Sequence, residues 1–259
     1  MTFDLVVATV DRVDAIGRLL SSLECQTHTA FRVLLIDQND DDRLADVVGA
    51  YSTLQIKRLG SARGLSRARN IALPRIEAEV VGFPDDDCVY APDLLERVAR
   101  RFEEDATLDG LTGREPAWTT GAALLTRDNL WNRAISFTIF LRRTIVERVG
   151  AFDEMLGLPA SSGEEIDYLI RALDGGARIE YDPSLVVEHD MKPGAVAFGA
   201  REGASLGYIL RKHGYPARTL ARMFVRPVGG VVVALAQRDY RRARFQLDTL
   251  RGRVRGYCS

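Results

Sequence analysis

The chain has 259 residues, 46% of them hydrophobic and 27% charged, which excludes disordered, collagen-like and coiled-coil proteins and is ordinary for a globular enzyme. This length predicts one large domain or two closely joined ones. Three scattered cysteines, Cys25, Cys88 and Cys258, argue against a disulfide framework or a CxxC metal site and favour a reducing cytosol. The longest apolar run, at 227–236, is shorter than the roughly 18 residues of a membrane-spanning helix.

The formal net charge of −1 conceals an uneven distribution. Residues 195–259 contain 13 Lys and Arg against 3 Asp and Glu, whereas the residues before them contain 22 against 33. An acidic body with a basic C-terminal segment predicts that the two parts meet different partners. We therefore place a boundary near residues 192–194, between a domain over 1–194 and a helical basic segment over 195–259.

Short runs of β-branched residues alternate with helical patterns through the first half of the chain. The strands expected from these runs are Phe3–Thr9, Arg32–Asp37, Gln55–Leu59 and Glu79–Phe83. Helices are expected after a capping residue at Asp11, over Gly64–Leu73, and from Pro92. This β-α-β order predicts an α/β fold with a mostly parallel, twisted sheet and helices on both sides.

Polar residues collect where three of the expected strands end, at Thr9–Arg12, Asp37–Asp42 and Asp85–Asp87. Ligands of open α/β sheets bind beyond the carboxyl ends of the strands. We therefore expect one binding site along this edge. The first strand is followed by neither a GxGxxG loop nor a P-loop, which counts against a dinucleotide-binding Rossmann domain.

Three carboxylates follow one another in Pro84-Asp85-Asp86-Asp87, directly after an apolar strand. Side chains this close repel one another unless they share a cation or some of them stay protonated. A hard divalent cation with oxygen ligands satisfies this requirement, and Mg or Mn would bridge the carboxylates to a diphosphate. A solvated acidic turn is the alternative, and the triplet alone does not decide between the two.

The string FPDDDCVYAPDLL resembles the DxD region of the family-2 glycosyltransferases, which have the GT-A fold. Other stretches from Phe3 to His189 are similar to the same family in the same order: TVDR, LLIDQND, GLSRARNIAL, and FLRRTIVERVGAFDE with GEEIDYLIRAL. Each motif alone is weak, and the order of the five carries the resemblance. It implies a nucleotide-diphospho-sugar donor, expected to be a UDP-sugar, a Mn or Mg cofactor, and inversion at the anomeric carbon.

The resemblance also implies how the donor is bound. Thr9, Asp11 and Arg12 are expected to line the nucleotide pocket, and Asp37 is expected to contact the base. A guanidinium suits a phosphate or a base edge, so one of the arginines near the third expected helix is expected to reach the nucleotide. The candidates, which would otherwise face solvent, are Arg63, Arg67 and Arg69.

The acidic triplet divides into two roles by the same resemblance. Asp85 and Asp86 are expected to contact the ribose or the donor sugar, and Asp87 is expected to bind the metal. His189 ends an expected strand, LVVEH, and relatives often carry a histidine there. It is interpreted either as a second metal ligand or as a structural histidine.

The segment Gly163-Glu164-Glu165-Ile166-Asp167 opens a further expected helix. Taken alone, Ser162 and Glu165 fit a capping box, and this structural interpretation is the stronger one. The resemblance reverses the order, because the family places an acidic catalytic base here, usually in a Glu-Asp pair. Glu165, the second member, is therefore the candidate base that accepts the proton of a sugar hydroxyl, and Glu164 is the alternative.

The basic segment over 195–259 is expected to form arginine-rich helices with an apolar component. This combination fits an interfacial segment on anionic lipid, and hence a cytoplasmic protein at the inner face of the cell membrane with a glycan or lipid-linked acceptor. A helical cap packed on the first domain fits equally well. Nucleic acid is not expected as a partner, because no recognition motif accompanies the charge.

Two other functions match part of the sequence. Asp85-x-Asp87-x-Val89 fits the DxDx(T/V) pattern of haloacid-dehalogenase-like phosphatases, in which the first Asp is the nucleophile. That pattern normally lies near the N-terminus, and the lysines that follow it here, Lys192 and Lys212, lie in no convincing setting. A catalytically dead nucleotide-sugar-binding domain is the third possibility; it would bind nucleotide without hydrolysing a donor.

Overall fold

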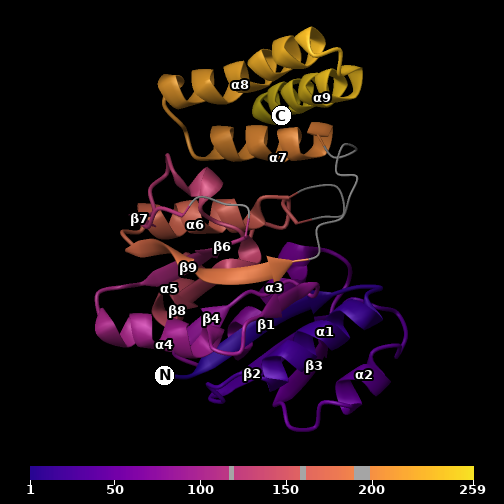
Figure 1. Ribbon diagram of the computed structural model, residues 1–259, viewed down its shortest axis with the longest axis vertical. Helices are drawn as coiled ribbons and strands as arrows, with labels where there is room; N and C mark the ends of the chain where they lie inside the picture. The colour runs from indigo at the N-terminus through magenta and orange to yellow at the C-terminus, as the bar shows by residue number, and fades with distance from the viewer. Residues whose placement is uncertain (117–119, 158–161, 190–198) are drawn as a thin grey trace.

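A computed structural model describes residues 1–116, 120–157, 162–189 and 199–259 of the chain. A twisted sheet carries helices on both faces, and a layer of three further helices lies above it (Figure 1). The strands are β1 Phe3–Thr9, β2 Phe31–Asp37, β3 Ile56–Gly60, β4 Val80–Gly82, β5 Cys88–Tyr90, β6 Gly110–Arg114, β7 Ala123–Leu124, β8 Ile139–Arg142 and β9 Ile179–His189. The helices are α1 Val13–Glu24, α2 Ala45–Gly49, α3 Leu65–Ala72, α4 Leu94–Glu104, α5 Arg143–Val149, α6 Glu164–Asp174, α7 Gly199–Lys212, α8 Ala217–Ala236 and α9 Tyr240–Cys258, with short 3-10 helices at Leu73–Arg75, Leu130–Asn132 and Ser136–Thr138.

The sheet has the strand order β3-β2-β1-β4-β8-β6-β9-β5, and β7 pairs with β9. Strands β3, β2, β1 and β4 are parallel neighbours, as are β6 and β9, whereas β8 runs antiparallel between β4 and β6. The expected mostly parallel sheet is thus confirmed, and each of the four expected strands lies within one residue of its predicted bounds. The register pairs Thr9 with Asp37, so the ends of β1 and β2 lie side by side.

Both faces of the central strands are buried, because alternate residues enter two different cores. Phe3, Leu5 and Val7 of β1 pack with the apolar faces of α1 and α4. Val6, between them, packs on the opposite face with α3, α5 and α6. Helix α7 joins this second core through Ile209 and Leu210, so the C-terminal layer is continuous with the hydrophobic core.

Helices α7 and α9 pack with their backbones in contact. Glycines recur on the facing sides of both helices, and a Cβ at Gly203 or Gly207 would overlap the carbonyl oxygens of Thr249 and Arg253. The reverse contact is equally tight, because a Cβ at Gly256 would overlap the carbonyl of Ala204. Only residues without a side chain allow this approach, so the glycines of the two helices hold the C-terminal layer together.

An ion-pair network joins α6 to α7. The buried carboxylate of Asp167 on α6 accepts Lys212 Nζ at 2.7 Å and lies 2.8 Å from His213 Nε2. Lys212 also donates to Asp153 at 2.6 Å, and Arg171 donates to Asp167 at 3.0 Å. The helix that carries Glu164 and Glu165 is therefore tied to the C-terminal layer as well as to the sheet. The packed-cap interpretation of the basic segment describes α7 well.

Two expected helix caps are wrong. Asp11 has φ +57° and lies two residues before α1, whose N-cap is Arg12; its carboxylate pairs with arginines instead of the helix N-terminus. The N-cap of α6 is Gly163, in the left-handed region at φ +87°, and no side chain caps this helix. The Ser162–Glu165 capping box does not form, because Ser162 is one residue too early and its N–H donates to Ser205 Oγ.

The expectation that no segment is long and apolar enough to span a membrane is also wrong. Helix α8 has 20 residues, and an 18-residue stretch of it has a mean hydropathy of 1.5, which meets that condition by length and composition. The helix continues through Pro227, and the ten residues before it add Arg218, Arg222 and Arg226 to otherwise small and apolar side chains. The predicted boundary at 192–194 lies outside the described residues, and the division into two domains stays a prediction.

The Asp167 network predicts a pH-dependent contribution to stability. Burial alone would raise the pKa of Asp167, but hydrogen bonds from His213 and Lys212 lower it from 3.8 to about 2. A lowered pKa in the folded state stabilises the protein above about pH 4, and this stabilisation is lost as the pH falls toward 2. Asp167→Asn should lower the free energy of unfolding by about 2–3 kcal/mol at pH 7, measured by urea denaturation.

The difference between Asp167→Asn and the unchanged protein should shrink as the pH falls from about 4 to 2. The matched control is Asp174→Asn on the same helix, whose carboxylate is partly exposed and lies 3.4 Å from Arg127; it should cost less than about 1 kcal/mol. A loss that stays constant over this pH range would contradict the assigned network.

Candidate functional site

The acidic triplet lies in the loop between β4 and β5, at the sheet edge where β1 and β2 also end. The backbone of β5 pairs with the last residues of β9 in antiparallel register, with Cys88 opposite His189. This pairing brings His189, which lies 102 positions after Asp87, beside the triplet. The expected site on the edge is therefore assembled from four strand ends.

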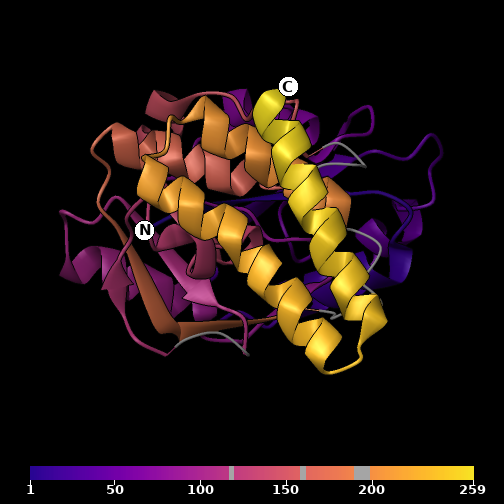
Figure 2. The ribbon, with the colours of Figure 1, turned by 90° about the horizontal axis from the view of Figure 1, so that it is seen from above.

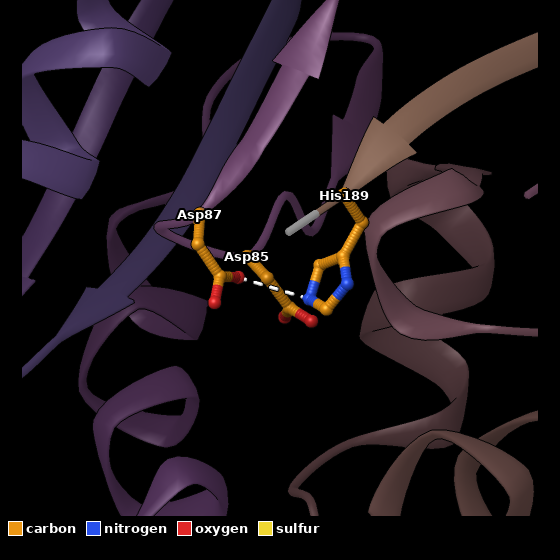
Figure 3. A group of neighbouring side chains, drawn as sticks. All are labelled: Asp85, Asp87 and His189. Carbon is orange, nitrogen blue, oxygen red and sulfur yellow. Dashed lines mark ion pairs between the residues drawn. The ribbon is translucent and has the colours of Figure 1, made fainter. Parts of the chain in front are cut away.

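Asp85, Asp87 and His189 converge on one point (Figure 3). One ligand atom from each lies within 4.8 Å of the others, and His189 Nε2 is 3.0 Å from Asp87 Oδ1. The imidazole stacks on Phe137, with ring centroids 4.7 Å apart and planes 4° from parallel. Two carboxylates and an imidazole are ligands that a divalent cation such as Mn2+ accepts, so the donor set fits a metal.

Asp85 is placed where it could contact the donor and also bind a metal. The sequence placed it with Asp86 at the donor, and its carboxylate also belongs to the metal-binding group. Burial, opposed by the charge of Arg69, raises the pKa of Asp85 to about 6. Ser136 donates to both of its oxygens, at 3.1 and 3.2 Å. Ser136 was missed in the sequence, because no recognisable pattern surrounds it.

Thr9, at the end of β1, and Arg12, three residues after it, bind the carboxylates of Asp86 and Asp87. Thr9 Oγ1 donates to Asp86 at 2.7 Å, and Arg12 Nη1 lies 2.7 Å from Asp86 and 2.6 Å from Asp87. Burial raises the pKa of Asp86, while the bonds from Thr9 and Arg12 oppose the rise. Thr9 and Arg12 are thus brought to the triplet, as the sequence predicts, and Arg12 supplies positive charge to two of its three carboxylates.

Arg69 joins the triplet to the first turn of α6. Its side chain is 1% exposed in the protein, and the guanidinium donates to Glu164 at 2.9 Å and approaches Asp85 at 3.4 Å. It lies over the rings of Phe83 and Phe152, at 5.7 and 5.4 Å. Of the three candidate arginines, Arg69 is therefore the one at the centre of the site, where it pairs with protein carboxylates.

Glu165 lines a small pocket beside this pair. Arg69, Ser136 and Phe152 are among the residues that share the cavity. Burial, followed by the negative charge of Glu164, raises the pKa of Glu165. The two adjacent glutamates are thus distinguished: Glu164 is buried and bound to Arg69, and Glu165 is half-buried with a pKa shifted upward.

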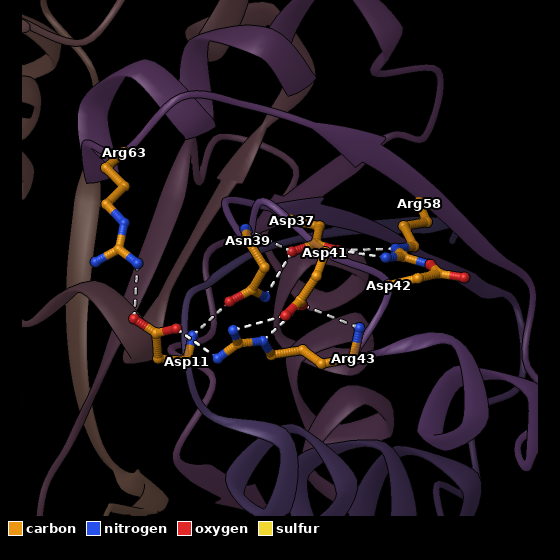
Figure 4. Close-up of polar contacts among 8 residues, drawn as sticks. All are labelled: Asp11, Asp37, Asn39, Asp41, Asp42, Arg43, Arg58 and Arg63. Carbon is orange, nitrogen blue, oxygen red and sulfur yellow. Dashed lines mark hydrogen bonds and ion pairs between the residues drawn. The ribbon is translucent and has the colours of Figure 1, made fainter.

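A second group of charged side chains extends from the ends of β1 and β2 (Figure 4). Asp37 accepts Arg58 at 2.7 Å and the Asn39 amide at 2.7 Å. Asp11 accepts Arg43 at 2.7 Å and Arg63 at 2.8 Å, and its N–H donates to Asn39. An open cleft of about 390 Å³, lined by Asp11, Arg12 and Asp87 among others, connects this group to the triplet.

The structure separates one predicted residue from the rest. Arg67 points to Glu154, at 3.2 Å, and is not among the residues that line the cleft or contact the triplet. Arg58 was missed in the sequence, although it lies beside Asp37. The only signal for it was its place in the strand next to β2, and that contact depends on the sheet order.

A model of the family described as "Glycosyl transferase family 2" matches residues 4–152. The chain is 24% identical over 207 residues to a pre-mycofactocin glycosyltransferase of Mycobacterium tuberculosis, covering 72% of this chain and 42% of that protein. It is 22% identical to glycosyltransferase AglE of Haloferax volcanii, over 73% of this chain and 67% of that protein. The chain thus spans less than half of the mycobacterial relative.

Solved glycosyltransferases share the fold. The mannosyltransferase PcManGT from Pyrobaculum calidifontis, in complex with GDP-Man and Mn2+, superposes with a TM-score of 0.72 at 16% identity, covering 98% of this chain and 86% of that one. TarS 1-349 of S. aureus in complex with UDP-GlcNAc has a TM-score of 0.66 at 18% identity, covering 97% and 92%. The expected GT-A architecture is confirmed by these likenesses.

The buried Arg69–Glu164 pair predicts a double-mutant effect. Arg69→Met should lower the free energy of unfolding by about 3–5 kcal/mol, because it leaves a buried carboxylate without its cation. Adding Glu164→Gln should recover part of that loss, since the uncompensated charge is then gone. Urea denaturation of the two single variants and the double variant measures the coupling. A double variant that is no more stable than Arg69→Met would show that the pair is not the reason for the loss.

Proposed function

The chain belongs to glycosyltransferase family 2, and we propose that it moves a sugar from a nucleotide-diphospho-sugar, a UDP-sugar in the first instance, to a hydroxyl of a glycan or lipid-linked acceptor, with inversion. The observation that supports this most strongly is the meeting of the Asp85–Asp87 triplet, His189 and the Glu164–Glu165 pair at one sheet edge. A nucleotide cleft opens beside them. The activity needs these three parts together.

The nucleotide side of the donor is assigned to Thr9, Asp11, Arg12 and Asp37. Arg58 and Asn39 hold the Asp37 carboxylate in one orientation. In that orientation it is assigned to contact the base or the ribose of the donor. Arg12 and Arg63 border the same region and now pair with carboxylates. A diphosphate entering the cleft would offer both guanidiniums new oxygens.

The metal side is assigned to Asp87 and His189, with Asp85 able to join them, and the cofactor to Mn or Mg. When bound there, a divalent cation would supply Lewis-acid stabilisation of the negative charge on a departing diphosphate. The protein holds these ligands in place beforehand, since Phe137 stacks on His189 and Ser136 donates to Asp85. Asp86 stays with Thr9 and Arg12, beside the ribose or donor sugar.

The general base is assigned to Glu165. Glu164 is tied to Arg69 and buried, so it positions the first turn of α6 and orients Arg69. Glu165 lines the neighbouring cavity with a raised pKa. A carboxylate with a raised pKa is the stronger proton acceptor when ionised, which suits removal of a proton from a sugar hydroxyl. The proton passes to Glu165 as the oxygen attacks the anomeric carbon opposite the diphosphate.

The two alternative functions, a phosphohydrolase and a catalytically dead domain, can be distinguished from this proposal. The phosphohydrolase interpretation is wrong, because both the matching family and the fold neighbours are glycosyltransferases. A catalytically dead domain differs from the proposal in one result, binding of nucleotide without slow hydrolysis of any donor. Metal-dependent stabilisation and hydrolysis across UDP-, GDP- and dTDP-sugars test this directly and identify the nucleotide.

For partners and localisation we propose an anionic membrane surface and a peripheral position at the inner, cytoplasmic face of the membrane. The support is the basic C-terminal segment and its apolar helix α8. No nucleic acid is proposed, since the arginines accompany aliphatic side chains and no recognition motif.

The metal assignment predicts the behaviour of Asp87→Ala. The variant should fold and lose Mn- or Mg-dependent donor binding, because it removes a carboxylate shared by the proposed metal group. Isothermal titration with donor, with and without metal, measures the loss. Asp93→Ala is the matched control: this carboxylate lies six residues further along and is exposed. Unchanged donor affinity and metal dependence in Asp87→Ala would overturn the assignment.

The base assignment predicts a selective loss of transfer in Glu165→Gln. Glutamine keeps the size but cannot accept a proton at neutral pH, and loss of a general base costs about 10²–10⁴-fold in rate. Thermal stability and donor affinity should stay nearly normal. In the unchanged enzyme, the acid limb of the pH–rate profile should lie above the ordinary Glu value of 4.5, because Glu165 has a raised pKa and must be ionised to act.

Glu164→Gln is the control for this variant. It keeps a hydrogen-bonding group opposite Arg69, so transfer should fall less than in Glu165→Gln. If Glu164→Gln abolishes transfer and Glu165→Gln does not, the base is the first member of the pair. If both variants transfer sugar at the normal rate, the base lies elsewhere.

A further inference from the structure

Helix α8 is apolar on two opposite faces. One face, with Thr219, Met223, Pro227 and Ala234, is buried against the rest of the protein. The other carries Val225, Val228, Val232 and Leu235, which are 63, 45, 63 and 50% exposed. These four follow one another at spacings of three and four residues, so they form one continuous stripe. A contiguous aliphatic stripe exposed on a helix whose opposite face is already buried is typical of a surface that contacts lipid or a partner.

The stripe is continued by arginines. Arg218 and Arg222 precede Val225 on the same face, since they lie at the same helical spacing. Residues 217–259 contain ten arginines and two aspartates. Arg244 and Arg251 on the neighbouring helix α9 are 86 and 70% exposed in their side chains. An exposed aliphatic strip thus lies within a strongly positive surface.

The surface lies on the outermost layer of the molecule. Helices α8 and α9 cover α7 on the side away from the sheet, and both are seen whole from above (Figure 2). The layer is held by the glycine contacts of α7 with α9 and by Met223 in the core. Because Met223, Pro227 and Ala234 are buried on the inner face of α8, the helix cannot turn its stripe inward without exposing them.

We propose that this face of α8 lies in the headgroup region of an anionic bilayer, with Val225, Val228, Val232 and Leu235 inserted and the flanking arginines on lipid phosphates. Burial of the aliphatic side chains and attraction of the arginines act together in this position. The exposed Tyr240, just after α8, is of a type common at that depth. The proposal deepens the membrane partner proposed above and does not depend on the transfer reaction.

Other occupants fit the surface less well. A second copy of the chain would bring one arginine-rich segment against another, and like charges oppose that contact. A transmembrane position for α8 would bury Arg222 and Arg226 in hydrocarbon and would separate the helix from α9. Nucleic acid would match the arginines and leave the aliphatic stripe in water. Anionic lipid is the partner that satisfies both the charge and the apolar face.

Flotation of the full-length protein with vesicles tests the proposal. We expect binding to vesicles of phosphatidylcholine with 30% phosphatidylglycerol, and at least tenfold weaker binding to phosphatidylcholine alone. The double variant Val225→Glu/Val232→Glu should lose at least tenfold in affinity for the anionic vesicles. The matched control, Leu124→Glu/Met155→Glu, adds the same charges at aliphatic positions that are 51 and 66% exposed elsewhere, and should bind normally.

A second variant tests the same proposal if the Val225→Glu/Val232→Glu variant fails to fold. Arg218→Gln/Arg222→Gln changes only exposed side chains and should weaken anionic binding and its salt dependence. Equal binding of wild type and a folded stripe variant, or no preference for anionic lipid, would overturn the proposal. So would sedimentation showing a wild-type dimer that the stripe variant dissociates without lipid. Donor hydrolysis without vesicles reports on the transfer chemistry separately, so failure of one proposal is not failure of the other.

Discussion

The crowding of negative charge at one sheet edge is the constraint on which the site depends. The carboxylates of Asp85, Asp86, Asp87, Glu164 and Glu165 lie close together, and burial and the negative charges among them both contribute to the raised pKa values of Asp85, Asp86 and Glu165. Among the described residues, Arg12, Arg69 and His189 pair with four of these five carboxylates. Burial and mutual repulsion raise the pKa values of Asp85 and Glu165. A divalent cation would offset part of this negative charge, and a carboxylate with a raised pKa suits the general base proposed above.

Two arginines, one half-buried and one buried, neutralise different carboxylates of the site. Arg12 neutralises the triplet from the loop after β1, and Arg69 neutralises Glu164 from α3. Glu164 and Glu165 differ because of Arg69, since one glutamate is bound to it and the other lines the cavity beside it. Neighbouring residues of one type thereby acquire different chemistry.

The C-terminal layer contributes to the site from a distance. Asp167 lies on α6 two residues after Glu165 and is bound by Lys212, the last residue of α7, and by His213. The glycines that hold α9 on α7 therefore also support the helix that carries the proposed base. The two interpretations of the basic segment, a packed cap and an interfacial segment, apply to different surfaces: the inner face of the layer is packed, and the face of α8 is open to a partner.

The sequence by itself determined the first four strands, their order along the chain and the residues at their ends, because β1, β2 and β4 are short apolar runs with polar residues shortly after them. It also identified the acidic triplet, the Glu164–Glu165 pair and His189 as candidates. Only the tertiary structure decided their partners. Arg69 meets Glu164 95 positions away, and His189 meets Asp87 through the β5–β9 pairing. Local pattern could not show that Ser136 and Arg58 reach the site, nor that Asp11 and Ser162 are not caps, because those contacts depend on sheet order and loop conformation.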